Sequence, residues 1–421
     1  MKILSKIYPG VLAAVVAAYL IIPIAGCKVD APGLFDPGTL PQPVVDSLSP
    51  AVSALAGIDT VTVYGKNFSA NKVEDGVYFN STLVNGTSFY SATTTMLKLK
   101  APALSGDTIA IRVFVIGAVA FSPTVVYQLK PAIGKFSSFS ATERAYGVTT
   151  GADGNLYASI TNSTLAVKDE GIFKINSDGT RAVPAYILPT TSPVNILWSS
   201  MKFGPSGFVY GIKGARQAYK LAPGVANPGA NPSWAAIAQG SMNDMDFDPD
   251  HNLWICGNAI KIGTDTMNIL RAVPAGTITG FHFTGTIRGA RFYNGSLYVT
   301  ATVGAANQVW RAPWAADTVQ TPQLFFDMST AYAGTIPVIY AITFSADGDM
   351  YLGCDGPDYL IVVHPSGSVE RPYGLYVASG VLTSPCKAFA WAGMTLYATT
   401  ASGGLLKIAT GKPGAPYYGI Q

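Results

Sequence analysis

The sequence predicts an all-β protein in which an immunoglobulin-sized β-sandwich is followed by a six-bladed β-propeller. Short β-branched and aromatic runs, separated by turn residues, fill residues 43–130 and are typical of a sandwich. From residue 145 onward one turn-and-strand motif recurs six times, which indicates a repeat architecture. A chain of 421 residues also exceeds one typical domain, so at least two are expected.

The first 26 residues have the layout of a secretory signal peptide. A positively charged start precedes an apolar run over residues 11–24, and small residues lead to Cys27. The run is shorter than the roughly 20 residues that a membrane-spanning helix needs. An uncleaved anchor helix is the alternative to a cleaved signal.

The residues around the predicted cleavage point resemble a bacterial lipobox, Ile24-Ala25-Gly26-Cys27. By that resemblance the Cys27 thiol receives a diacylglycerol and the freed amine a further acyl chain, so the membrane is a partner of Cys27. More than one chain is what stable anchoring requires. Residues 27–42, rich in proline and without periodicity, are predicted to form an extended tether.

The segment 43–130 resembles an IPT/TIG domain. The resemblance rests on Pro43-Val44-Val45, on Gly57, on the strand and turn from Val61 to Phe68, and on Ala101-Pro102. It implies an immunoglobulin-like fold that acts as a spacer or contact module, so no chemistry is assigned to it.

Each copy of the later repeat is a short strand, a turn and an aliphatic-aromatic pair. The closing aromatics follow one another at intervals of roughly 50 residues, the period of propeller blades, and are Tyr157, Tyr210, Trp254, Tyr298, Tyr351 and Tyr397. The repeat resembles NHL-type blades over residues 145–421, within a propeller domain of 131–421. The ring is expected to close either through Tyr417–Ile420 or through Phe136–Phe139 pairing with the last blade.

The turn residues of the repeat are interpreted as structural. Aspartate caps tight turns and glycine supplies a positive φ, which explains Asp153, Asp250 and Asp347. His251 lies in the same kind of turn. The recurring aromatics are expected to form the core between blades.

Aligning the blades predicts a ring of residues where the innermost strands begin, the usual place for ligand sites in propellers. Its members are Tyr146, Ser199, Asn243, Arg288, Tyr340 and Lys387. The next ring is made of small residues except for Asp244. Candidate ligand-binding residues are therefore Tyr146, Asn243, Asp244, Arg288, Tyr340 and Lys387. With Asp244 beside them, Arg288 and Lys387 could bind a carboxylate or sugar hydroxyls; an ion-pair ring that only closes the channel is the alternative.

Loops after the second strands add polar residues at the same end, namely Arg216, Asp265, Asn307, Asp355 and Asp358. Besides Cys27 the chain has Cys256, Cys354 and Cys386, an odd number, so at least one is unpaired within the chain. A Cys354–Cys386 disulfide is plausible because one lies in the loop of blade five and the other begins blade six. Three buried free thiols are the alternative.

No catalytic residue, metal site or cofactor is predicted. His251, His282 and His364 occupy different blade positions, and acidic residues do not converge. A net charge of +3 without a basic cluster excludes a nucleic-acid partner.

The chain has a lipobox, then an IPT/TIG-like segment, then an NHL-like propeller. This domain order resembles that of surface proteins of Bacteroidetes-type bacteria. It implies a non-catalytic, membrane-anchored binding protein of the outer membrane that captures a glycan or an envelope protein through the propeller face. Whether it faces the periplasm or the surface is left open. The alternative is a propeller enzyme of the lyase or lactone-hydrolase type.

Overall fold

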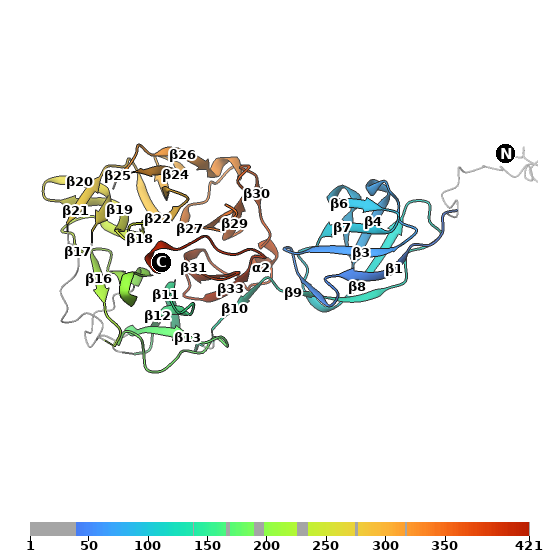
Figure 1. Ribbon diagram of the computed structural model, residues 1–421, viewed down its shortest axis with the longest axis horizontal. Coiled ribbons are helices and arrows are strands. Elements are labelled where there is room, and N and C mark those ends of the chain that lie inside the picture. The colour runs from blue at the N-terminus through green and yellow to red at the C-terminus, as the bar shows by residue number, and fades with distance from the viewer. Residues whose placement is uncertain are drawn as a thin grey trace, which may run out of the picture.

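The computed structural model describes residues 39–137, 139–165, 169–188, 198–224, 235–273, 277–315 and 318–420. The predicted signal peptide, Cys27 and most of the predicted tether lie outside these residues. A β-sandwich and a ring of six sheets follow one another along the chain, which confirms the all-β class (Figure 1). Within the described ranges, no helix is both long enough and apolar enough to cross a membrane.

The sandwich consists of two sheets that pack face to face. The first sheet has the order β1 (Val44–Ser49), β3 (Thr60–Lys66), β7 (Met96–Lys100), β6 (Phe89–Thr93). The second has the order β2 (Ser53–Leu55), β9 (Val125–Lys130), β8 (Gly106–Val115), β4 (Asp75–Phe79), β5 (Thr82–Asn85). Alternate residues such as Val61, Val63, Leu97 and Leu99 point inward and are fully buried, as the period of two predicts.

Each blade of the propeller is one antiparallel sheet whose first strand is innermost. Blade one contains β11 (Glu143–Thr150), β12 (Leu156–Asn162) and β13 (Asp169–Ile175). Blade two contains β14 (Trp198–Phe203), β15 (Val209–Lys213), β16 (Gln217–Leu221) and β17 (Ala235–Ala236). Blade three contains β18 (Ser241–Phe247), β19 (Leu253–Ile262), β20 (Asp265–Ala272) and β21 (Ile278–Phe281).

The second half of the ring repeats this plan. Blade four contains β22 (Thr286–Tyr293), β23 (Ser296–Val303), β24 (Ala306–Ala315), β25 (Thr318–Val319) and β26 (Gln323–Asp327). Blade five contains β27 (Ile339–Phe344), β28 (Met350–Cys354), β29 (Leu360–Val363) and β30 (Val369–Glu370), followed by α2 (Gly374–Ala378). Blade six contains β31 (Cys386–Ala392), β32 (Thr395–Thr400), β33 (Leu405–Ala409) and β10 (Ile133–Lys135).

The recurring aromatics pack between neighbouring blades, as predicted. Five of the six closing aromatics contact the ring at the end of the next blade's inner strand, and the pairs are Tyr157–Phe203, Tyr210–Phe247, Trp254–Phe292, Tyr298–Phe344 and Tyr351–Trp391. Their centroids lie 4.6–5.6 Å apart, the range of favourable aromatic pairs. Between blades six and one, Tyr397 packs on Phe136 instead.

The turns show why the repeat contains glycine. Gly154, Gly207, Gly295 and Gly348 all have positive φ at the equivalent position. His251 occupies that position in blade three with a φ of 63°, and its Nδ1 lies 2.9 Å from the Tyr418 carbonyl oxygen. The imidazole thus holds the end of the chain from a backbone conformation that four of the other blades give to glycine.

The ring is closed by residues that precede blade one. β10 pairs antiparallel with β33 and becomes the outermost strand of blade six, and the Phe136 amide extends the pairing to the Leu405 carbonyl. Of the two predicted closures, the one near Phe136 is therefore correct but begins at Ile133. Closure through Tyr417–Ile420 is wrong, because that segment runs across the axis of the ring and forms no blade strand (Figure 1).

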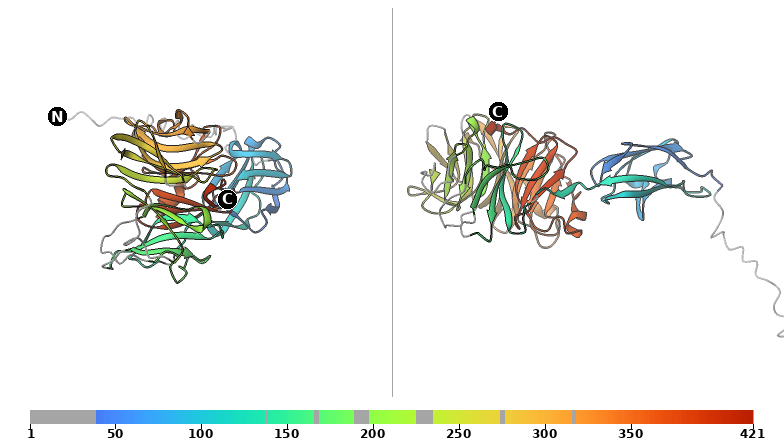
Figure 2. Two further views of the ribbon diagram at one scale, coloured as in Figure 1. Left: turned by 60° about the vertical axis from the view of Figure 1, so that its left-hand side comes forward. Right: turned by 90° about the horizontal axis from the view of Figure 1, so that it is seen from below.

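The sandwich lies beside the rim of the ring and leaves both faces of the propeller uncovered (Figure 2). Ile58 of the sandwich packs against the core between blades five and six. The Ala132 amide donates to the Tyr376 hydroxyl oxygen, and Lys100 pairs with Glu370. These contacts place the junction between the sandwich and the propeller at the rim rather than over a face.

Candidate functional site

All six residues predicted to form the first ring lie at equivalent β-bulges. In each blade the pairing of the first and second strands shifts register at this residue, in the order Tyr146, Ser199, Asn243, Arg288, Tyr340 and Lys387. A bulge interrupts the ladder and redirects the side chain of the extra residue. The predicted equivalence of these positions is thus a property of the fold, while their role in binding stays a prediction.

Blades four, five and six bring a charged cluster together at this end. The Lys387 ammonium lies over the Tyr340 ring, and the Tyr340 hydroxyl donates to Asp355 Oδ2 at 3.1 Å. Asp355 Oδ1 accepts from the Val338 amide at 2.6 Å, which fixes the carboxylate at the start of β27. We call Arg288, Tyr340, Asp355 and Lys387 the basic cluster.

The cations of the basic cluster are incompletely neutralised. Burial lowers the pKa of Lys387 to about 8; the charge of Asp355 opposes this shift, and the charge of Arg288 adds to it. Arg288 donates to the Thr302 hydroxyl at 2.6 Å. Neither cation has a carboxylate oxygen within ion-pair distance in the described part of the chain.

Asp244 does not lie beside these cations as a partner, so that part of the prediction is wrong. Its oxygens accept from the Ser200 hydroxyl at 2.6 Å and from the amides of Met245 and Ala290 at 2.9 Å each. Burial raises its pKa. Asp244 thereby ties blades two, three and four together, and Asp355 is the carboxylate near Arg288 and Lys387.

Two other candidates also make contacts between blades. The Asn243 side-chain amide donates to the Ile287 carbonyl at 2.6 Å. The Tyr146 carbonyl accepts from the Thr399 hydroxyl at 2.6 Å, and the Tyr146 ring is half-buried. Both residues belong to the same ring as the basic cluster but lie on other blades.

A third ring of axis-facing residues was not predicted. It lies two residues beyond the second ring and consists of Thr149, Lys202, Asp246, Arg291, Thr343 and Ala390. The sequence could have predicted this third ring, because residues i and i+2 of a strand share a face. Asp246 is fully buried and accepts from Arg291 Nη1 at 2.8 Å and from the Phe292 amide at 2.8 Å.

The C-terminal segment, residues 411–420, covers the other end of the axis. The Ala415 amide donates to the Phe344 carbonyl at 3.0 Å, and Arg291 Nη2 donates to the Pro416 carbonyl at 3.0 Å. The Tyr417 hydroxyl donates to the Phe203 carbonyl. A ligand of the first ring therefore has to approach from the bulge side.

The loop residues at the bulge end differ in what they contact. Asn307 is buried and donates to the Ile336 carbonyl at 3.1 Å, and Asp358 accepts from Tyr332 and Arg371. Arg216 and Asp265 are exposed. Of the loop residues, Asp355 contributes directly to the basic cluster.

The histidines lie in three separate places. His251 holds the C-terminal segment, His282 is exposed at the rim, and His364 lies between Asp349 and Glu370 at 2.8 and 3.1 Å. Among the described residues no group of three histidine, cysteine or acidic side chains has a geometry that could hold a metal ion.

The three cysteines within the described ranges are buried free thiols, and the Cys354–Cys386 disulfide is not formed. The two residues are close along the ring, but Cys354 packs in the core between blades four and five, and Cys386 in the core between blades five and six. Burial raises the pKa of Cys354 to about 12 and also raises the pKa values of Cys256 and Cys386.

We therefore expect no thiol of the 28–421 fragment to react with Ellman's reagent at pH 8 in the native state. After denaturation without reductant, three thiols per chain should react. One thiol per denatured chain would instead indicate that a disulfide had formed.

Comparison with known proteins identifies the sandwich. Residues 43–128 match the family of the IPT/TIG domain, as the sequence predicted for this segment. No curated protein is significantly similar in sequence to the chain. The NHL-type character of the blades stays a prediction.

Solved structures with a similar arrangement are distant. An auxiliary nutrient binding protein from Bacteroides thetaiotaomicron is 10% identical, with 89% of this chain and 99% of that chain covered and a TM-score of 0.45. Virginiamycin B lyase from Staphylococcus aureus is 14% identical, with 66% of this chain and 98% of that chain covered and a TM-score of 0.46. A gluconolactonase from Xanthomonas campestris is 12% identical, with 73% of this chain and 90% of that chain covered and a TM-score of 0.45. These likenesses do not decide between binding and catalysis.

Proposed function

We propose that this protein is an envelope binding protein that captures an acidic glycan at the bulge end of its propeller. One observation carries the proposal: Arg288 and Lys387 present positive charge beside Tyr340 without a neutralising ion pair in the described residues. A uronic-acid carboxylate would supply the missing acceptor, and charge-assisted hydrogen bonds are the strong ones.

The rest of the chain would present this site away from a membrane. The predicted lipid on Cys27 would anchor the protein in the outer membrane, and residues 27–42 would tether it. The sandwich would act as a spacer, since it leaves both propeller faces uncovered (Figure 2).

The test is binding of the 28–421 fragment to an array of acidic and neutral polysaccharides. We expect retention of uronic-acid polymers and weaker retention of neutral ones. Arg288→Met should reduce the affinity about tenfold, the effect of losing one charge-assisted hydrogen bond. Arg216→Met is the matched control, because Arg216 is exposed at the same end and outside the basic cluster; its affinity should be unchanged.

Two results would contradict the proposal. If no polysaccharide is retained, the proposal of a glycan ligand is wrong and a protein partner becomes the better hypothesis. If Arg288→Met and Arg216→Met bind equally, the basic cluster is not the site.

A second candidate function is supported by the pKa of Lys387. An amine with a pKa near 8, beside a tyrosine and a carboxylate, has the properties of a general base. A lyase or hydrolase would shorten the bound polymer, whereas a binding protein would leave its length unchanged. Chromatography of the polymer after overnight incubation separates the two.

A further inference from the structure

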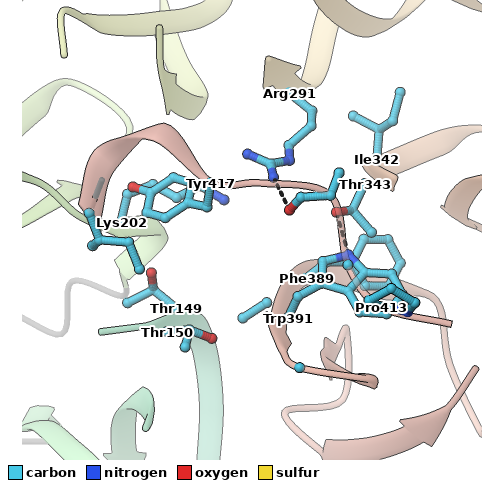
Figure 3. Close-up of a pocket in the computed structure, with 15 residues that line it drawn as sticks. Thr149, Thr150, Lys202, Arg291, Ile342, Thr343, Phe389, Trp391, Pro413 and Tyr417 are labelled. Atoms are coloured by element: carbon cyan, nitrogen blue, oxygen red, sulfur yellow. Dashed lines mark hydrogen bonds between the residues drawn. The ribbon is translucent and has the colours of Figure 1, made fainter. Parts of the chain in front are cut away.

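A cavity of about 430 Å³ lies near the axis on the side of the C-terminal segment, at the opposite end from the basic cluster. Its walls come from the inner strands of five blades and from the C-terminal segment (Figure 3). Its size and mixed lining are those of small-molecule sites, which are mostly apolar with a few convergent polar groups. Phe389 and Trp391 form one wall, and Tyr417 forms another.

Lys202 is the charged group of the cavity that remains available. Its ammonium lies 6.0 Å from the centroid of the Tyr417 ring, and no acceptor in the described ranges hydrogen-bonds to it. Arg291 also lines the cavity, but Asp246 and the carbonyls of Ala415 and Pro416 already accept its hydrogen bonds. The charge of Lys202 also acts on the buried Asp244 carboxylate, but no carboxylate oxygen of the described residues lies within ion-pair distance of its ammonium. The cavity therefore presents one positive charge that has neither an ion pair nor a hydrogen-bond acceptor.

The hydroxyl groups around the cavity add donors. Thr150 Oγ1 is buried and has no hydrogen-bond partner among the described residues. Thr343 Oγ1 accepts from Trp391 Nε1 at 2.9 Å, and Thr149 Oγ1 accepts from the Phe203 amide at 3.3 Å. Since each hydroxyl also carries a proton, these groups can still donate.

The cavity has more hydrogen-bond donors than acceptors, and its lysine lacks an ion pair. A ligand with an anionic group would satisfy these donors, because a buried polar group without a partner costs free energy. A flat apolar ligand body would pack against the aromatic wall. We propose that this cavity is a second binding site, and that it takes a small carboxylic acid whose carboxylate pairs with Lys202 and Thr150 while its apolar body lies against Trp391.

The test uses phenylacetate and its neutral analogue phenylacetamide, titrated into the 28–421 fragment by calorimetry. Phenylacetate should bind at least about tenfold more tightly than the amide, the effect expected of a charged hydrogen bond. Lys202→Met should weaken phenylacetate binding about tenfold. Thr150→Val is a milder second variant that should weaken it severalfold, and circular dichroism checks that both variants are folded.

Lys387→Met is the matched control, because Lys387 is a half-buried lysine at the other end of the axis. The affinity of this variant for phenylacetate should equal that of the parent fragment. The test of the cavity is thus independent of glycan binding at the basic cluster. Tryptophan fluorescence should change on binding, and Trp391→Phe should remove that change while the heat of binding remains.

Four outcomes would overturn this proposal. These are equal affinity for acid and amide, parental affinity in folded Lys202→Met, loss of phenylacetate binding in Lys387→Met, and absence of binding by both probes at millimolar concentration.

Discussion

Replacing Arg291 by methionine should lower the free energy of unfolding of the propeller by about 3–5 kcal/mol. Arg291 is buried and its guanidinium pairs at 2.8 Å with Asp246, which is fully buried. The substitution leaves a buried carboxylate without its cation, and this is the costly way to break such a pair. It also removes the donor that holds the Ala415 and Pro416 carbonyls of the C-terminal segment.

Urea denaturation followed by tryptophan fluorescence measures this loss, because all six tryptophans lie in the propeller segment of the sequence. Arg216→Met removes an exposed arginine and should change stability by less than about 0.5 kcal/mol. The double variant Asp246→Leu/Arg291→Met should recover part of the loss, since no buried charge is left behind. If Arg291→Met is as stable as Arg216→Met, the Asp246–Arg291 ion pair contributes little to stability.

The affinity for an acidic glycan should fall about tenfold or more between pH 7 and pH 10. Lys387 has a pKa of about 8, lowered mainly by burial. Its ammonium is therefore protonated below pH 8 and loses its charge as the pH rises through that value. One charge-assisted hydrogen bond to the ligand is then lost, which corresponds to about tenfold in affinity.

Titration calorimetry at several pH values tests this dependence. Lys387→Arg keeps the positive charge at every pH used, because the guanidinium does not deprotonate in this range. That variant should bind with little dependence on pH. A pH profile that is the same in the parent and in Lys387→Arg would remove Lys387 from the site.

The repeat made most of the propeller predictable. Its turns need a positive φ and its closing aromatics need a neighbouring ring, so both recur in every blade with little dependence on distant residues. The same periodicity places the six bulge residues at equivalent positions of their blades. Extending it by two residues along each inner strand would also have found Lys202, Asp246 and Arg291.

Contacts between blades were less predictable. The alignment of the blades placed Asp244 beside Arg288 and Lys387, but its oxygens accept from Ser200 and from two amides instead. Asp355 is the carboxylate near these cations, without forming an ion pair with either, because the loop after β28 turns back to the start of β27. Similarly, Cys354 and Cys386 are neighbours in the repeat but face different cores.

By itself, the sequence determined the two-part all-β order, the number of blades and the residues that share each ring, because these depend on local periodicity. The tertiary structure decided which strand closes the ring, what the C-terminal segment covers and which charges remain unpaired. Ring closure joins Ile133 to Ile408, and Arg291 meets Asp246 and Pro416. Such contacts depend on the assembled ring, where residues far apart in the chain compete for the same donors and acceptors.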